Sequence, residues 1–143
     1  MVTDLRRGRP GCQALQRLYG VGWLTALIIW AELGDCRRFA NSDAAVRYAG
    51  LDITVQSSDG KRAPGHLARQ GSPALRWALF EAAKSASRAT SPDHRYYGEV
   101  ADRLGGKRST LSVARKLARR AHHILRELGD AAFAPATVQE VAA

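Results

Sequence analysis

The feature that most constrains the fold of this sequence is the recurrence of apolar residues three and four positions apart, interrupted by glycines. This spacing places apolar side chains along one face of a helix, whereas a half-buried strand needs strict alternation. Gly20, Gly34, Gly50 and Gly129 stand where such stretches end, in positions that favour a left-handed residue. The pattern therefore predicts a mainly α fold, with helices at about 13–19, 23–33, 42–49, from 73 onward, 91–104 and 110–128.

Two serines are expected to cap helices of this set. The helix expected at 42–49 runs from Ser42, and Ser72 precedes Pro73, which is favoured in a first turn. The three tryptophans, Trp23, Trp30 and Trp77, are expected in the core of their helices.

One segment departs from the helical pattern. Residues 51–71 contain the β-branched Ile53 and Thr54, followed by a Ser-Ser-Asp-Gly sequence at 57–60 that favours a turn. We predict one short β-like or loop segment there. A length of 143 residues suits one domain, so we expect a leader or partial helix at 1–17, a folded body at 18–128 and a flexible, alanine-rich tail at 129–143.

The glycines at 20 and 22 suggest a specific use of the backbone. The stretch 18–26 reads Leu-Tyr-Gly-Val-Gly-Trp-Leu-Thr-Ala, the form of a helix-hairpin-helix. Such a turn exposes N–H groups at the start of its second helix, where the helix dipole attracts a phosphate without reading a base. The alternative is an ordinary corner between two helices with glycine in the turn. The sequence favours Gly20 and Gly22 as contacts to nucleic acid.

The charge balance indicates a polyanionic partner. The chain carries 22 Lys and Arg against 13 Asp and Glu, a net charge of +9, with a sequence pI near 10.4, which is the range of nucleic-acid binders. No acidic residue lies between residues 103 and 126, and a helix there would carry its cations as a stripe. A solvated helix face is the alternative. The candidate nucleic-acid contacts in this region are Lys107, Arg108, Arg115, Lys116 and Arg119.

Other classes of protein and site are disfavoured. Cys12 and Cys36 lack the close spacing of a zinc site or a disulfide framework, and the histidines lack ligand spacing, so no metal site is expected in this chain. The longest uncharged apolar run, 21–31, is about half of the roughly 20 residues that a membrane span needs. A cytoplasmic protein without membrane contact is expected.

Ser58 is the candidate for chemistry within the non-helical segment. A Ser-Ser-Asp-Gly turn is common, but here four cations follow within eighteen residues. A phosphate brought to this turn would meet positive charge able to stabilise a pentavalent transition state. These cations are Lys61, Arg62, Arg69 and Arg76.

The order of these motifs resembles the carboxy-terminal transposase domain of the DEDD-type insertion-sequence transposases, the group that includes the Piv-type DNA invertases. The similarity covers about residues 18–128, which is the expected body. It runs through YGVGWLTA at 19–26, AELGD at 31–35, Phe39, YAGL at 48–51, then Ser58, Gly60-Lys61, Gly65, Leu67, Arg69, Gly71, Leu75-Arg76, Tyr96-Tyr97, Gly106-Lys107 and ARKL at 114–117.

The resemblance implies a recombinase that cuts and joins DNA in insertion-sequence transposition through a serine nucleophile, which maps to Ser58. It implies three partners: DNA, a structured guide RNA and further subunits of a homo-oligomer. Family members also carry an acidic RuvC-like domain that binds a divalent metal such as Mg²⁺. Because only Asp4 precedes the matching region, we expect that domain to be missing, strand transfer to require it, and no cofactor to bind this chain alone.

Two positions depart from the family pattern, since Ile53 stands where proline is common and Asp59 where glycine is common. Two alternatives to a recombinase domain remain open. One is a noncatalytic helix-hairpin-helix module that binds nucleic acid, and the other is a remnant of a truncated transposase.

Overall fold

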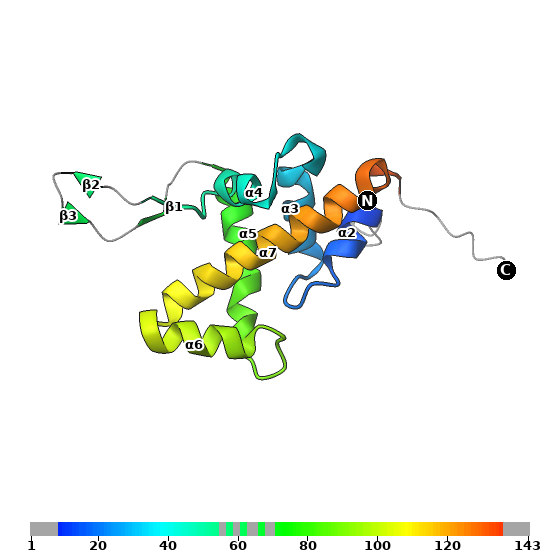
Figure 1. Cartoon of the computed structure of the whole chain (residues 1–143). Coiled ribbons are helices and arrows are strands. Elements are labelled where there is room, and N and C mark those ends of the chain that lie inside the picture. The colour runs from blue at the N-terminus through cyan, green and yellow to red at the C-terminus, as the bar shows by residue number, and fades with distance from the viewer. Residues whose placement is uncertain (1–8, 55–56, 59–60, 63–65, 68–70, 136–143) are drawn as a thin grey trace.

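The structure, a computed structural model, describes residues 9–54, 57–58, 61–62, 66–67 and 71–135. Within these residues the chain is mainly helical, as predicted, and the helices gather into one body from which a narrow extension projects (Figure 1). The helices are α2 (Pro10–Leu15), α3 (Trp23–Leu33), α4 (Ser42–Tyr48), α5 (Pro73–Ala83), α6 (His94–Leu104) and α7 (Gly106–Leu128). Three short 3₁₀ helices join them, η1 (Cys36–Arg38), η2 (Lys84–Ser87) and η3 (Gly129–Phe133).

Helix α7 is the centre of the body, and it packs against α4, α5 and α6. Val113, Leu117, Ala121 and Leu125 recur every four residues on one face of α7, and all four are buried. Helices α3 and α5 pack side by side and antiparallel. Ser72 at the start of α5 donates a hydrogen bond to Glu32 near the end of α3, and Gly20 before α3 lies against Ala82 near the end of α5. The core therefore lies between α7 and the α3–α5 pair.

Three helix starts and one cap differ from the sequence prediction. Helix α2 covers residues 10–15 instead of 13–19, and α6 begins at His94 instead of residue 91. Asn41, not Ser42, caps α4, because its side-chain oxygen accepts a hydrogen bond from the Ala44 N–H at 3.0 Å. Helix α7 begins at Gly106 rather than at residue 110, since Gly105 alone, with a φ of 90°, makes the turn after α6. The cap at Ser72 is confirmed, and its oxygen accepts from the Leu75 N–H at 3.2 Å.

The first and last parts of the body pack together on Trp30 of α3. The Trp30 indole N–H donates to the Ala132 carbonyl at 2.8 Å, and the ring lies 5.7 Å from that of Phe133. Gly11 of α2 lies against the same indole, because a Cβ at that residue would come within 2.7 Å of it. Within the described residues, α2, α3 and η3 therefore pack together around Trp30.

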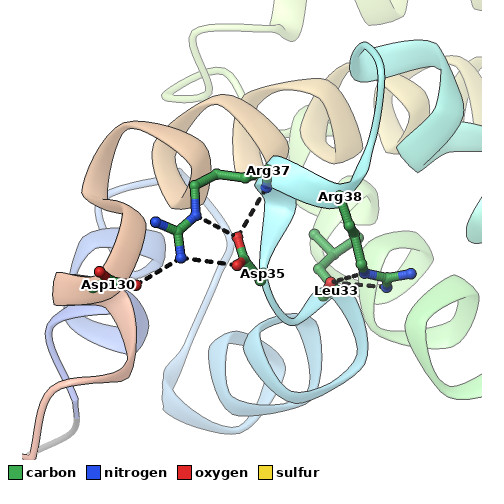
Figure 2. A network of polar contacts seen from close by, with 5 residues as sticks. All are labelled: Leu33, Asp35, Arg37, Arg38 and Asp130. Carbon is green, nitrogen blue, oxygen red and sulfur yellow. Dashed lines mark hydrogen bonds and ion pairs between the residues drawn. The ribbon is translucent and has the colours of Figure 1, made fainter.

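Charged side chains of η1 reinforce this closure (Figure 2). Arg37 binds the Asp35 carboxylate through Nε and Nη2 and also reaches Asp130 of η3 at 2.6 Å. Arg38 donates from Nε and Nη2 to the Leu33 carbonyl at the end of α3. That bond satisfies a carbonyl that the helix itself leaves unpaired.

The projecting extension consists of four strands of two residues each, and we call it the arm. Strand β1 (Ile53–Thr54) pairs antiparallel with β4 (His66–Leu67), and β2 (Ser57–Ser58) pairs antiparallel with β3 (Lys61–Arg62). Figure 1 shows β2 and β3 at the far end of the arm, away from the helices. All four strands lie inside the segment predicted as non-helical at 51–71.

The expectation that all three tryptophans are core residues is wrong for Trp77, and Trp23 and Trp30 are only half-buried. Trp77 is 50% exposed, because leucines and alanines of α5 form the buried face of that helix. None of the described helices combines the length and the apolar composition that crossing a bilayer requires.

Candidate nucleic-acid interface

The arm is fixed to the helical body at both of its ends. At one end, Nε of Arg115 on α7 donates to the Leu51 carbonyl at 2.8 Å. At the other, Gly71 has a φ of 130°, and a Cβ there would lie 2.3 Å from the Tyr48 carbonyl oxygen. The same carbonyl accepts from the Ser72 N–H at 3.0 Å. The end of α4 and the middle of α7 therefore set where the arm leaves the body.

Ser58 lies on β2, at the distal end of the arm. In the antiparallel register, Ser58 is opposite Lys61 and Ser57 is opposite Arg62. The backbone thus brings two of the predicted cations next to the candidate nucleophile, while the side chains of these residues lie outside what the structure describes. Arg69 lies wholly outside the described residues, and Arg76 lies on α5, with the rest of the helical body.

The cations of α7 do not form one free stripe, because residues of other elements engage them. Arg119 pairs with Asp43 of α4 at 3.1 Å, and Arg120 makes a bidentate pair with buried Asp93, which precedes α6. The Lys116 ammonium lies 3.6 Å from the centre of the Tyr96 ring. The cations therefore have no acidic neighbour in sequence between residues 103 and 126, but the fold brings partners from other elements to three of them.

An open groove of about 400 Å³ lies at the root of the arm, between α4, the start of β1 and α7. Three arginines and two aspartates line it together with Val46: Asp43, Arg47, Asp52, Arg115 and Arg119. The sequence prediction included Arg115 and Arg119 but missed Arg47, which is the only arginine of α4 and has no charged neighbour of its own sign within the helix. We call this the root groove.

Arg115 is the most buried of these cations. Burial lowers the pKa of its guanidinium from the ordinary value, since the charged form is separated from water. Its recorded acceptors within the described chain are the Leu51 carbonyl and, at 3.4 Å, the Ser112 hydroxyl. A guanidinium has five N–H donors, so Arg115 keeps donors for a further acceptor.

The two glycines of the 20–22 turn differ in their surroundings. Gly20 has a φ of 85°, and a Cβ there would approach Ser85 Oγ to 2.2 Å and the Ala82 carbonyl oxygen to 2.6 Å. Close packing against the end of α5 therefore explains glycine at this position. Gly22 caps α3 in an extended conformation with nothing within 4 Å of its would-be Cβ, and no side chain caps the helix. Phosphate contact at both glycines remains a prediction.

Two further predicted cations, Lys107 and Arg108, are exposed in the first turn of α7, which contains no acidic residue. A helix N-terminus carries a partial positive charge, so cations there are repelled. A bound polyanion would relieve that repulsion.

Other buried titratable groups do not line the root groove. Burial raises the pKa of the Cys36 thiol to about 11, so it stays protonated and unreactive near neutral pH. Burial lowers the pKa of His122, and its Nε2 and the Nη1 of Arg76 are buried without a hydrogen-bond partner in the described part of the chain. Among the described residues no three His, Cys, Asp or Glu side chains are grouped to hold a metal ion.

Comparison with known proteins supplies a family. The family model for the Transposase IS116/IS110/IS902 family matches residues 12–98. The transposase for insertion sequence element IS1111A of Coxiella burnetii (strain RSA 493 / Nine Mile phase I) is 30% identical over 119 residues, which cover 80% of this chain and 33% of that protein. The insertion element IS110 uncharacterized 43.6 kDa protein of Streptomyces coelicolor (strain ATCC BAA-471 / A3(2) / M145) is 28% identical over 132 residues, 92% of this chain and 32% of that protein. The chain thus spans about a third of the length of these curated relatives.

Proposed function

This chain belongs to the IS116/IS110/IS902 family of transposases, and we propose that it acts in the transposition of an insertion sequence as a DNA recombinase domain of the DEDD and Piv type. In this proposal Ser58 is the nucleophile, and the basic residues around the arm and on α7 hold nucleic acid. The observation that carries it is the register of the arm, which pairs Ser57 and Ser58 with Arg62 and Lys61 at the end of a projecting hairpin. That placement supports contact with a bound duplex at a distance from the helical core.

The proposed step is an exchange of phosphate esters. The Ser58 oxygen attacks a DNA phosphorus, a P–O bond to the deoxyribose breaks as the serine ester forms, and the hydroxyl proton passes to a base while the sugar oxygen leaves as a hydroxyl. Nearby cations offset the charge of the pentavalent transition state. Because the phosphoserine ester conserves the bond energy, a second DNA hydroxyl can reverse the exchange and rejoin the strands.

A divalent metal does not fit the described residues of this chain, because they offer no cluster of three ligands. We propose that a RuvC-like acidic domain supplies any Mg²⁺, and we derive no step through it. Strand transfer then requires that domain, a structured guide RNA and more than one subunit at the DNA junction, in line with the length of the relatives, of which this chain spans about a third.

The test is covalent capture of DNA by the complete recombinase carrying this domain. We expect Ser58→Ala to bind DNA with unchanged affinity and to form no adduct on a denaturing gel with end-labelled DNA. Ser57→Ala is the matched control, since it alters the neighbouring hydroxyl on the same strand, and it should keep the adduct. An adduct retained by Ser58→Ala would remove the nucleophilic role from that residue.

A noncatalytic binding module is the second candidate, and the completeness of the core favours it. Buried residues from α2, α3, α4, α5, α7 and η3 form one apolar cluster, which is what a body able to fold and bind alone needs. Salt-sensitive, sequence-tolerant binding of a duplex by this chain would support it. Lack of any DNA or RNA binding by this chain at low salt would exclude this second candidate. A cooperative thermal transition followed by circular dichroism would exclude a remnant without a stable core.

A further inference from the structure

The root groove has the composition of a site for one phosphate group rather than of a general basic surface. Its three guanidinium groups come from two helices, Arg47 from the last turn of α4 and the pair Arg115 and Arg119 from successive turns of α7. Guanidinium groups match phosphate oxygens in geometry and charge. Three guanidinium groups lining one groove are therefore suited to an anion such as a phosphate.

The aspartate that faces these arginines occupies the position of such an anion. Asp43 accepts a hydrogen bond from Nε of Arg119 at 3.1 Å, yet both side chains of the pair are well exposed, 63% and 44% respectively. Exposed ion pairs contribute only about 0–1 kcal/mol. A phosphate can therefore displace the Asp43 carboxylate from Arg119 at little cost.

The other two arginines have unused capacity. Arg47 forms no ion pair with any residue that the structure describes, and it is exposed. Arg115 is partly buried with spare N–H donors, and Asp52 is the nearby carboxylate that favours its charge. With two carboxylates against three guanidinium groups, the groove keeps a net positive charge before any ligand binds.

From this arrangement we infer that the root groove binds a nucleic-acid phosphodiester through Arg47, Arg115 and Arg119, and that Asp43 competes with it for Arg119. The inference rests on the proposed function and adds to it a defined contact. Arg115 also holds the Leu51 carbonyl at the base of the arm, so a strand bound here lies where the arm leaves the body. The groove thus sets the position from which a bound strand approaches the arm.

The first test is binding of the full chain to a fluorescein-labelled 20-base-pair DNA duplex, measured by anisotropy over a series of salt concentrations. Arg47→Gln should weaken binding about 3- to 10-fold and lower the slope of log K against log salt by about 1, as expected for one lost phosphate contact. Arg95→Gln is the matched control, because Arg95 is 93% exposed on α6. It should change affinity less than about 2-fold.

The second test uses the competing carboxylate. Asp43→Asn frees Arg119 and should strengthen binding about 3- to 10-fold, whereas Asp102→Asn, an equal charge change at an exposed site on α6, should strengthen it less than about 2-fold. A general electrostatic effect would move both aspartate variants equally. That equality, or equal losses for the two arginine variants, would overturn the assignment of the groove while leaving the proposed function in place.

Two further measurements separate the possible ligands. An RNA hairpin with the same number of phosphates, tested in parallel, shows whether the groove holds DNA or RNA, and the same dependence on Arg47 and Asp43 with either one supports the inference. Tighter binding of polyglutamate with that dependence would overturn the choice of phosphodiester. If the unmodified chain binds neither nucleic acid at low salt, the inference fails, whereas the proposed recombinase function is decided separately by covalent capture with the complete protein.

Discussion

Replacing Gly20 by alanine should destabilise the body far more than the same change at Gly22, although both glycines belong to one motif. At Gly20 the φ of 85° would hold alanine in the left-handed region, at a cost of about 1–2 kcal/mol. The added Cβ would also lie 2.2 Å from Ser85 Oγ and 2.6 Å from the Ala82 carbonyl. The Ser85 hydroxyl donates to that same carbonyl at 2.6 Å, so relief of the contact breaks a bond worth about 0.5–1.5 kcal/mol.

The two costs together lower the free energy of unfolding by about 1.5–3.5 kcal/mol. For a domain of this size, about 3 kcal/mol corresponds to a fall in Tm of about 6–12 °C. Gly22→Ala meets open space and changes only an uncapped helix start, so it should cost about 1 kcal/mol or less. Urea unfolding followed by circular dichroism measures both variants.

Ser85 supplies a cycle that isolates the contact. Ser85→Ala removes the hydroxyl that the new Cβ would meet, so Gly20→Ala should cost about 1 kcal/mol less in that background. Similar losses for Gly20→Ala and Gly22→Ala would refute the packing explanation. An unchanged cost in the Ser85→Ala background would show instead that backbone strain or the contact with the Ala82 carbonyl, which this variant keeps, dominates.

Three further outcomes are expected. Asp93→Asn should lower the free energy of unfolding by about 1–3 kcal/mol at pH 7, because Arg120 is left without its bidentate partner. The Arg120 hydrogen bonds lower the pKa of Asp93, so the stability that they give is present above about pH 4 and is lost as the pH falls through the native pKa. Acid unfolding of the variant should lack that loss of stability. Burial lowers the pKa of His122, so the free energy of unfolding should decline as the pH falls below about 6.5 towards the native pKa. His122→Leu should flatten this dependence of stability on pH, measured by urea unfolding at several pH values. An unchanged pH dependence would contradict the argument that burial of His122 causes it. Lys107→Glu should raise stability by about 0.3–1 kcal/mol at the positive end of α7 while weakening DNA binding, and a loss of stability would contradict the helix-dipole argument.

Local signals in the sequence predicted most helix boundaries. Glycines on both sides of 23–33 fixed α3, and the Ser72-Pro73 pair fixed the start of α5. At α4, Asn41 and Ser42 are both good cap residues, so sequence alone does not choose between them. Periodicity likewise identified Trp77 as helical without showing that its side of α5 would stay exposed.

The root groove was beyond sequence reasoning because its charges meet only through the fold. Asp43 and Arg119 are 76 positions apart, and Arg115 reaches the carbonyl of Leu51 across 64 positions. A run without acidic residues on α7 was visible, but the aspartates that engage it come from elsewhere in the chain. Nothing in the sequence marked Arg47 as a candidate contact to nucleic acid, since a single arginine in the last turn of a helix is common.

The bond between Trp30 and the Ala132 carbonyl joins positions 102 residues apart. During synthesis, the indole leaves the ribosome long before its acceptor does. Helices α3 and α5 can pair early, but the layer around Trp30 stays open until η3 emerges, and such long-range closure comes at an entropic cost that slows folding. Completion of the native body therefore waits until synthesis has passed η3, and a stop codon shortly after α7 would leave the Trp30 indole without its acceptor and without the neighbouring Phe133 ring.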